Sequence, residues 1–161
     1  MSNIVDGLPA PKAIFDVECF DSEGKLKWRE TIHNVVTTVG KTDIIDKYLK
    51  GSSYTAAWFL LLAGSGSKAV GDTLASHAAW AEITVYTGNR PAITWGTTAT
   101  GSNTATVVSY SMTGSYTAAG VGCCTVATTN SGTLYNVGDF AVARSGASGD
   151  TINVTVTLSV T

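Results

Sequence analysis

Charged side chains are scarce in this sequence, and they are unevenly placed. Lysine, arginine, aspartate and glutamate make up 14% of the 161 residues, against about a quarter in an average globular protein. After Arg90 only Asp139, Arg144 and Asp150 remain. The net charge is −2, so the chain lacks the basic surface that nucleic-acid binding requires. A nearly uncharged second half is unusual for a cytosolic enzyme and suits a protein that acts as a stable or binding surface.

Residues that commonly build catalytic or metal sites are also few. The chain has two histidines, His33 and His77, and it contains neither His-Glu-x-x-His nor Cys-x-x-Cys. A zinc site would need more ligands at tighter spacing. No flanking sequence around the three cysteines supports a Cys–His nucleophile. We therefore expect no enzyme activity, no metal and no cofactor.

The segment from Gly64 to Lys68 has only a faint likeness to a phosphate-binding loop. The Walker pattern requires a glycine directly before the lysine and a serine or threonine directly after it. Here Ser67 precedes the lysine and Ala69 follows it. We therefore predict a flexible loop in solvent.

Long hydrophobic runs and a signal sequence are absent as well. No stretch reaches the roughly 18 apolar residues of a membrane span, and the N-terminus lacks the basic start and apolar core of a signal peptide. Cys123 and Cys124 are adjacent, so on a strand they would face opposite sides and could not easily bridge. We expect no membrane contact, synthesis in a cytoplasm, and free cysteines in the core.

Alternating apolar and polar residues dominate what is present. In the last strand Ile152, Val154 and Val156 alternate with hydroxyl and amide side chains, which is typical of a half-buried β-strand. Similar runs predict strands at 13–20, 25–32, 58–63, 81–86, 104–112, 120–128 and 134–143, with another beginning at 93. Many short strands separated by turns indicate an all-β fold, either a β-sandwich or a jelly roll.

One helix and one arm complete the predicted organisation. The apolar residues change to a helical period in the segment at about 42–50, where Thr42 can cap the start and Gly51 the end. Its predicted apolar face contains Ile44, Ile45, Tyr48 and Leu49. We expect a single domain over 12–161. Residues 1–11 form an extended arm that is either a frayed terminus or a contact with a neighbouring subunit.

The segment 71–96 gathers the most chemically distinctive side chains. It can be a binding surface, since Trp, Tyr and Arg dominate interface hot spots. It can equally be a structural unit with aromatic rings in the core and Arg90 paired with Glu82 or Asp72. The interface candidates also include residues of the arm and of the first hairpin, and the full set is Ile4, Leu8, Trp28, Arg29, His77, Trp80, Glu82, Tyr86, Arg90 and Trp95.

This segment resembles a pattern found in a group of tailed-phage virion proteins. The pattern runs Asp-Thr-x-x-Ser-His-x-x-Trp-x-Glu, then Tyr, Arg-Pro and Trp-Gly. Here it reads Asp72-Thr73-Leu-Ala-Ser76-His77-Ala-Ala-Trp80-Ala-Glu82, Tyr86, Arg90-Pro91 and Trp95-Gly96. Looser matches occur at Asn34-Val-Val36 and Gly149-Asp150-Thr151. The resemblance covers about 28–160 in outline and is dense only over 71–96.

The resemblance implies a capsid cement or decoration protein on the outer surface of the phage head. Such a protein would bind and bridge major capsid proteins, with a homo-dimer or homo-trimer as the expected assembly and no nucleic acid or membrane partner. Two alternatives stay open. One is a tail or fibre module of the virion. The other is a carbohydrate-binding module that stacks sugar rings on Trp58, Trp80 or Trp95.

Overall fold

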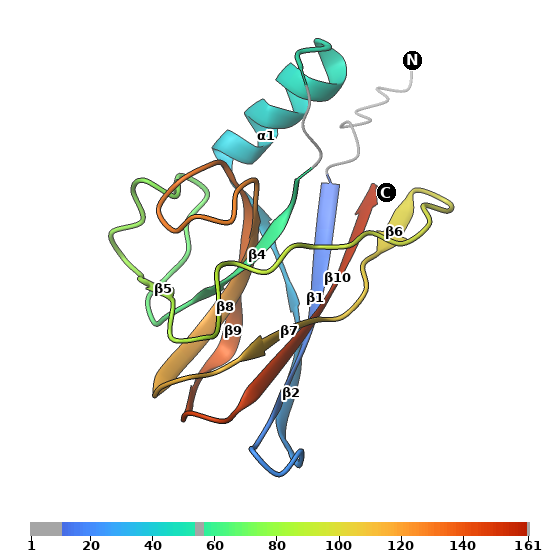
Figure 1. Cartoon of the computed structure of the whole chain (residues 1–161). Helices are drawn as coiled ribbons and strands as arrows, with labels where there is room; N and C mark the ends of the chain where they lie inside the picture. Colours follow the sequence, from blue (N-terminus) through green and yellow to red (C-terminus); the bar gives the residue numbers. More distant parts are fainter. Residues whose placement is uncertain (1–10, 54–56, 161) are drawn as a thin grey trace, which may run out of the picture.

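The structure is a sandwich of two antiparallel β-sheets with one helical segment at one end (Figure 1). It is a computed structural model and describes residues 11–53 and 57–160. The first sheet contains β2 (Leu26–His33), β1 (Pro11–Phe20), β10 (Thr151–Val160), β6 (Ser102–Thr104) and β7 (Val108–Ser111). The second contains β3 (Val35–Val36), β9 (Leu134–Gly146), β8 (Tyr116–Cys124), β4 (Phe59–Ala63) and β5 (Glu82–Ile83). The predicted β-sandwich is confirmed.

The first and last strands form the centre of the first sheet. β1 and β10 pair antiparallel over their full lengths, from Pro11 opposite Val160 to Phe20 opposite Thr151. Every second side chain of both strands points into the core, where Phe15 and Val154 are fully buried. Pro11, which the sequence assigned to the arm, is therefore already part of the sandwich.

The second sheet is buried on both faces over most of its area, although the second half of β9 is largely exposed. Its inner face joins the core between the sheets, and its outer face carries a second cluster that contains Leu61, Leu74, Trp80 and Leu134. Adjacent strand residues point to opposite faces, so neighbouring cysteines lie in different clusters: Cys123 in the first and Cys124 in the second. Cys19, Cys123 and Cys124 are all buried and free, as predicted.

The helical segment begins earlier than the sequence predicts. It consists of α1 (Thr38–Ile44) followed directly by η1 (Ile45–Leu49), a π-helical turn. The cap is Thr37, whose hydroxyl accepts a hydrogen bond from the Gly40 N–H at 3.0 Å, and the prediction of Thr42 is wrong. The same hydroxyl donates to the Leu134 carbonyl of β9, a tertiary contact that no local pattern reveals.

The packing of this segment also differs from its predicted apolar face. A Cβ on Gly40 would lie 2.2 Å from the Tyr135 carbonyl oxygen, so glycine permits the close approach of α1 to β9. Ile44 packs against the core, but Ile45 is 55% exposed and Tyr48 81% exposed. A π-turn holds more residues than an α-turn, so the positions after Ile44 rotate away from the packed face.

Several predicted strands are shorter than the sequence patterns suggest. The run at 104–112 is divided between β6 and β7, which pair with different parts of β10. The run at 81–86 reduces to β5. In place of a strand at 93 the chain makes isolated bridges from Ala92 to Phe59 and from Trp95 to Ala105.

Short or charged edges limit strand pairing with other molecules. The second sheet ends in β3 and β5, which have two residues each. The first sheet ends on one side in β2, which carries Lys27, Arg29 and Glu30. Short and charged edge strands are common devices against edge-to-edge association. Figure 1 places the turn between β1 and β2 at the end of the sandwich opposite α1 and the C-terminus.

Candidate functional site

The segment 71–96 runs along one side of the sandwich and joins the two sheets. β5 pairs with β4 in the second sheet, while Tyr86 bridges Met112, directly after β7. Further along, Ala92 bridges β4 and Trp95 bridges Ala105, between β6 and β7. The segment therefore closes a side that its short neighbouring strands would otherwise leave open.

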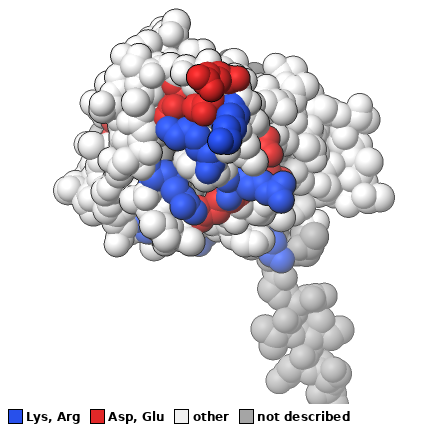
Figure 2. Space-filling view, turned by 90° about the horizontal axis from the view of Figure 1, so that it is seen from below, with Lys and Arg blue, Asp and Glu red and all other residues white. Residues whose placement is uncertain are grey.

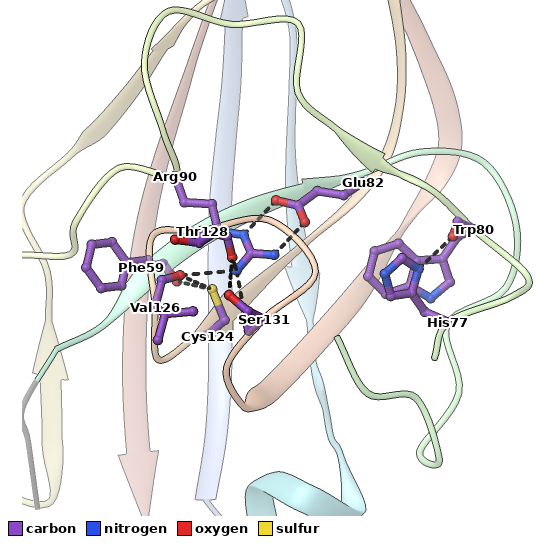
Figure 3. A network of polar contacts seen from close by, with 9 residues as sticks. All are labelled: Phe59, His77, Trp80, Glu82, Arg90, Cys124, Val126, Thr128 and Ser131. Carbon is purple, nitrogen blue, oxygen red and sulfur yellow. Dashed lines mark hydrogen bonds and ion pairs between the residues drawn. The ribbon is translucent and has the colours of Figure 1, made fainter. Parts of the chain in front are cut away.

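A buried ion pair stands at the centre of this segment (Figure 3). The Arg90 guanidinium contacts the Glu82 carboxylate through two bonds, Nε to Oε1 at 2.6 Å and Nη2 to Oε2 at 2.5 Å. The two side chains are 0% and 2% exposed. Arg90 Nη1 also donates to the carbonyl oxygens of Val126, Thr128 and Ser131. Arg90 thus fixes the loop between β8 and β9 to the segment, and of the two partners that the sequence offered, Glu82 and Asp72, it is Glu82 that pairs with Arg90.

The groups around this ion pair are poorly suited to acid–base or nucleophilic work. Burial raises the pKa of the Cys124 thiol to about 11, although the nearby Arg90 charge acts in the opposite direction. Burial likewise raises the pKa of Tyr86 to about 12. A reactive cysteine needs a lowered pKa and some exposure. Cys124 has neither, so it fills space in the second cluster.

His77 and Trp80 form a second, separate group in the segment. Their rings stack with centroids 4.2 Å apart, and His77 Nδ1 lies 2.9 Å from the Trp80 carbonyl oxygen. The Trp80 indole donates to Asp72 Oδ2 at 2.8 Å. Trp80 is 5% exposed, whereas His77 is half-buried. These contacts shape the loop before β5.

Lys68 turns inward and holds its own loop together. Residues 65–67 are exposed, in line with the predicted loop, but the Lys68 side chain is 1% exposed. Its ammonium group donates to the carbonyl oxygens of Gly64, Gly66 and Ala119 and lies 3.0 Å from Asp139 Oδ1. The N–H groups of the ammonium are used within the protein, so none is left to bind a phosphate.

Charged residues concentrate at the end of the sandwich that carries the turn between β1 and β2. Figure 2, which views this end, shows Lys, Arg, Asp and Glu side chains together within a largely uncharged surface. We call this region the charged end, and its residues are Asp21, Glu23, Lys25, Lys27, Arg29, Glu30, Arg144 and Asp150. The group combines charges that are far apart in the sequence.

Asp150 anchors the charged end from below the surface. Its Oδ2 accepts from Lys27 Nζ at 2.6 Å, from the Tyr116 hydroxyl at 2.9 Å and from the Ala147 N–H at 3.1 Å. Burial alone would raise the pKa of this carboxyl, but the donors outweigh that effect and lower the pKa. Asp150 is therefore ionised at neutral pH and fixes the turn before β10.

The predicted interface residues lie in different places. Trp28 and Arg29 are on β2 at the charged end, with the Trp28 ring against Phe140 at a centroid distance of 5.5 Å and under the Arg144 guanidinium at 5.7 Å. Trp95 is half-buried at the opposite end. Ile4 and Leu8 lie outside the described residues.

The remaining interface candidates have side chains that are buried inside the protein. Trp80, Tyr86 and Arg90 are 5%, 7% and 2% exposed, and the Glu82 side chain is 2% exposed. Side chains this enclosed stabilise the fold and cannot themselves touch another molecule. Of the interface candidates in the segment 71–96, His77 and Trp95 keep accessible surface.

Sequence reasoning found the charged hairpin at 16–30 as a contact candidate, but it missed Arg144 as part of that surface and the exposure of Tyr48. Lys25 and Lys27 alternate within the predicted hairpin, which signals a charged strand, but nothing local indicates that Arg144 joins them. Tyr48 was assigned to a packed helical face, and only the π-turn reveals its exposure. Both features depend on the three-dimensional structure and leave no local mark in the sequence.

Comparisons with known proteins assign the chain to no family. No family model matches it, and no curated protein sequence matches it. Within residues 11–53 and 57–160, no three His, Cys, Asp or Glu side chains lie together in a way that could hold a metal ion. In the same ranges no helix has the length and apolar character to cross a membrane.

Proposed function

We propose that this protein is a non-enzymatic capsid decoration protein that binds the outer surface of a tailed-phage head. It bridges neighbouring major capsid proteins and so stabilises the assembled shell, by itself or as a homo-dimer or homo-trimer. The resemblance of 71–96 to virion proteins motivates this proposal. The concentration of charged side chains at the end that carries the turn between β1 and β2 is the structural observation that carries it.

The charged end presents eight charged side chains, four of each sign, and a fixed pattern of both signs favours binding in one orientation. Complementary charges steer association and exclude wrong partners more than they add affinity. Lys27 and Arg144 have partners in Asp150 and Glu30. Lys25 and Arg29 form no ion pair within residues 11–53 and 57–160. Arg29 lies opposite Glu18 in the register of β1 and β2, so Lys25 is the side chain most open to carboxylates on a capsid surface.

Stabilisation of the shell then follows from mass action. A protein that binds the mature shell but not its unexpanded precursor favours the mature state by RT ln(1 + [L]/Kd), about 2.7 kcal/mol per site at a hundredfold excess over Kd. No bond of a substrate is made or broken.

Co-sedimentation with virion parts tests the proposal. Purified protein should sediment with mature heads, and less with unexpanded proheads or tails, when all come from the phage that encodes it. Lys25→Glu should weaken head binding roughly tenfold, a loss of about 1.4 kcal/mol. Lys41→Glu makes the same charge change in α1 at the opposite end and should bind like the wild type. Sedimentation with tails alone, or equal loss in both variants, would contradict the proposal.

A further inference from the structure

An aromatic groove opens at the end of the sandwich opposite the charged end. It has a volume of about 450 Å³ and lies between the helical segment, the loop before β6 and the ends of β1 and β10. Its principal side chains are Tyr48 of η1, Trp58 before β4, Trp95 of the segment 71–96 and Asn103 of β6. Residues from four separate parts of the sequence therefore form one surface.

The aromatic side chains of this groove are held in place from behind. Trp58 and Trp95 are half-buried and pack against the core. Trp58 meets the Tyr135 ring edge-on at a centroid distance of 4.9 Å, and the Trp95 backbone is bridged to Ala105. Tyr48 is 81% exposed. The groove thus has two supported indole rings and one exposed phenol ring.

Polar groups of the groove suit a ligand rich in hydroxyl groups. Asn103 donates to the Gly96 carbonyl at 3.0 Å and to the Thr98 hydroxyl at 2.7 Å. Its own carbonyl oxygen is buried and accepts no hydrogen bond within residues 11–53 and 57–160. Thr98, Ser102 and Ser159 also belong to the lining, and the Ser102 hydroxyl donates to the Leu158 carbonyl at 3.2 Å. A ligand that donates hydrogen bonds beside a flat apolar face would match this arrangement.

The charges of the groove argue for a neutral ligand. Its charged side chains are Asp43 and Lys47, which have opposite signs and lie four residues apart in the helical segment. Lys47 Nζ already donates to the Ser53 carbonyl at 2.7 Å. The site therefore offers no net charge to attract a phosphate, a nucleic acid or an acidic peptide.

We propose that this groove binds a neutral saccharide, with pyranose rings against Trp58, Trp95 and Tyr48 and sugar hydroxyls directed at the hydroxyl residues Thr98, Ser102 and Ser159 of its lining. Aromatic rings pack on the apolar faces of such ligands, while a few placed polar groups fix the orientation. Of the three tryptophans that the sequence offered for sugar stacking, the structure brings Trp58 and Trp95 together and buries Trp80. This inference is independent of head binding, which involves the opposite end.

Titration with neutral oligosaccharides tests this site directly. The probes are cellotetraose, mannotetraose and tri-N-acetylchitotriose, followed by calorimetry and by tryptophan fluorescence up to 10 mM sugar. At least one should bind with a Kd of roughly 1 mM or lower and shift the emission. Tyr48→Ala should weaken that binding about tenfold, and Trp95→Phe should reduce both affinity and spectral shift. Val142→Ala, another exposed apolar residue placed on β9, should bind like the wild type.

Three outcomes would overturn the inference. One is the absence of binding by all three sugars to folded wild-type protein. Another is unchanged affinity in Tyr48→Ala, whose side chain is too exposed for its loss to unfold the chain. The third is a fluorescence shift caused only by a peptide of residues 1–10 or by increasing protein concentration, which would make the groove a contact for this chain. Head binding can persist in each case, because the two sites are tested separately.

Discussion

Replacing Glu82 by glutamine should destabilise the fold severely, because it leaves the Arg90 charge buried and unneutralised. Glutamine keeps one acceptor for the guanidinium but turns an NH₂ group toward another donor. Removing one partner of a buried ion pair costs about 3–5 kcal/mol, and both side chains are almost fully buried. For a domain of this size the loss corresponds to a fall in Tm of roughly 6–20 °C.

Urea unfolding followed by tryptophan fluorescence measures this change. The midpoint should fall at constant m, since the surface exposed on unfolding is unchanged. Asp46→Asn is the matched control, because it breaks an exposed i,i+4 pair with Lys50 and should cost less than about 1 kcal/mol. A free energy of unfolding for Glu82→Gln within about 0.5 kcal/mol of the wild type would refute the structural role of the pair.

A double-mutant cycle separates the ion pair from the anchoring of the loop. The variant with Glu82→Met and Arg90→Met contains no unpaired buried charge, and replacement of buried pairs by apolar residues is often neutral or stabilising. It still loses the donor for the carbonyls of Val126, Thr128 and Ser131, of which the last two lie in exposed residues that water can reach. We expect the double variant to cost less than the sum of the two single variants. Additive effects would show that the two side chains act independently.

Other predictions follow from the close contacts of the fold. Gly40→Ala should destabilise by about 1–3 kcal/mol in urea, because its Cβ would collide with a β9 carbonyl, whereas Gly71→Ala, with open space around it, should be neutral. The lowered pKa of Asp150 means that its contribution is present above the unfolded pKa of about 3.9 and is lost as pH falls through the lower folded pKa. Acid unfolding should therefore be less steep for Asp150→Asn than for the wild type, and identical profiles would refute this. Since burial raises the pKa of Cys124 to about 11, a thiol reagent at pH 8 should label the native protein slowly and all three cysteines rapidly in urea.

The strand pattern of the core was predictable because burial on one face leaves a period of two in the sequence. Ala13, Phe15, Val17 and Cys19 are buried as that pattern indicates. The predictions failed where backbone geometry depends on a distant partner. The α1 cap, for instance, uses a hydroxyl that also bonds to β9, almost a hundred residues away, so a window around Thr42 could not identify it.

Surface sites were harder to predict than the core for the same reason. The sequence identified the aromatic and charged residues of 71–96, and it offered Arg90 both as an interface residue and as a partner of Glu82. Because both side chains are buried against each other in the structure, Arg90 is the partner of Glu82 and not an interface residue. The groove of Tyr48, Trp58 and Trp95 and the charged end each combine segments that have no common local signal.

The sequence alone determined the all-β class, the free buried cysteines and the shortage of reactive groups, because composition and the period of side chains depend only on neighbouring residues. Tertiary structure decided which polar residues are buried in pairs and which rings share a surface. Those outcomes depend on strand register and on close contacts such as that of Gly40, which bring together residues from opposite ends of the chain.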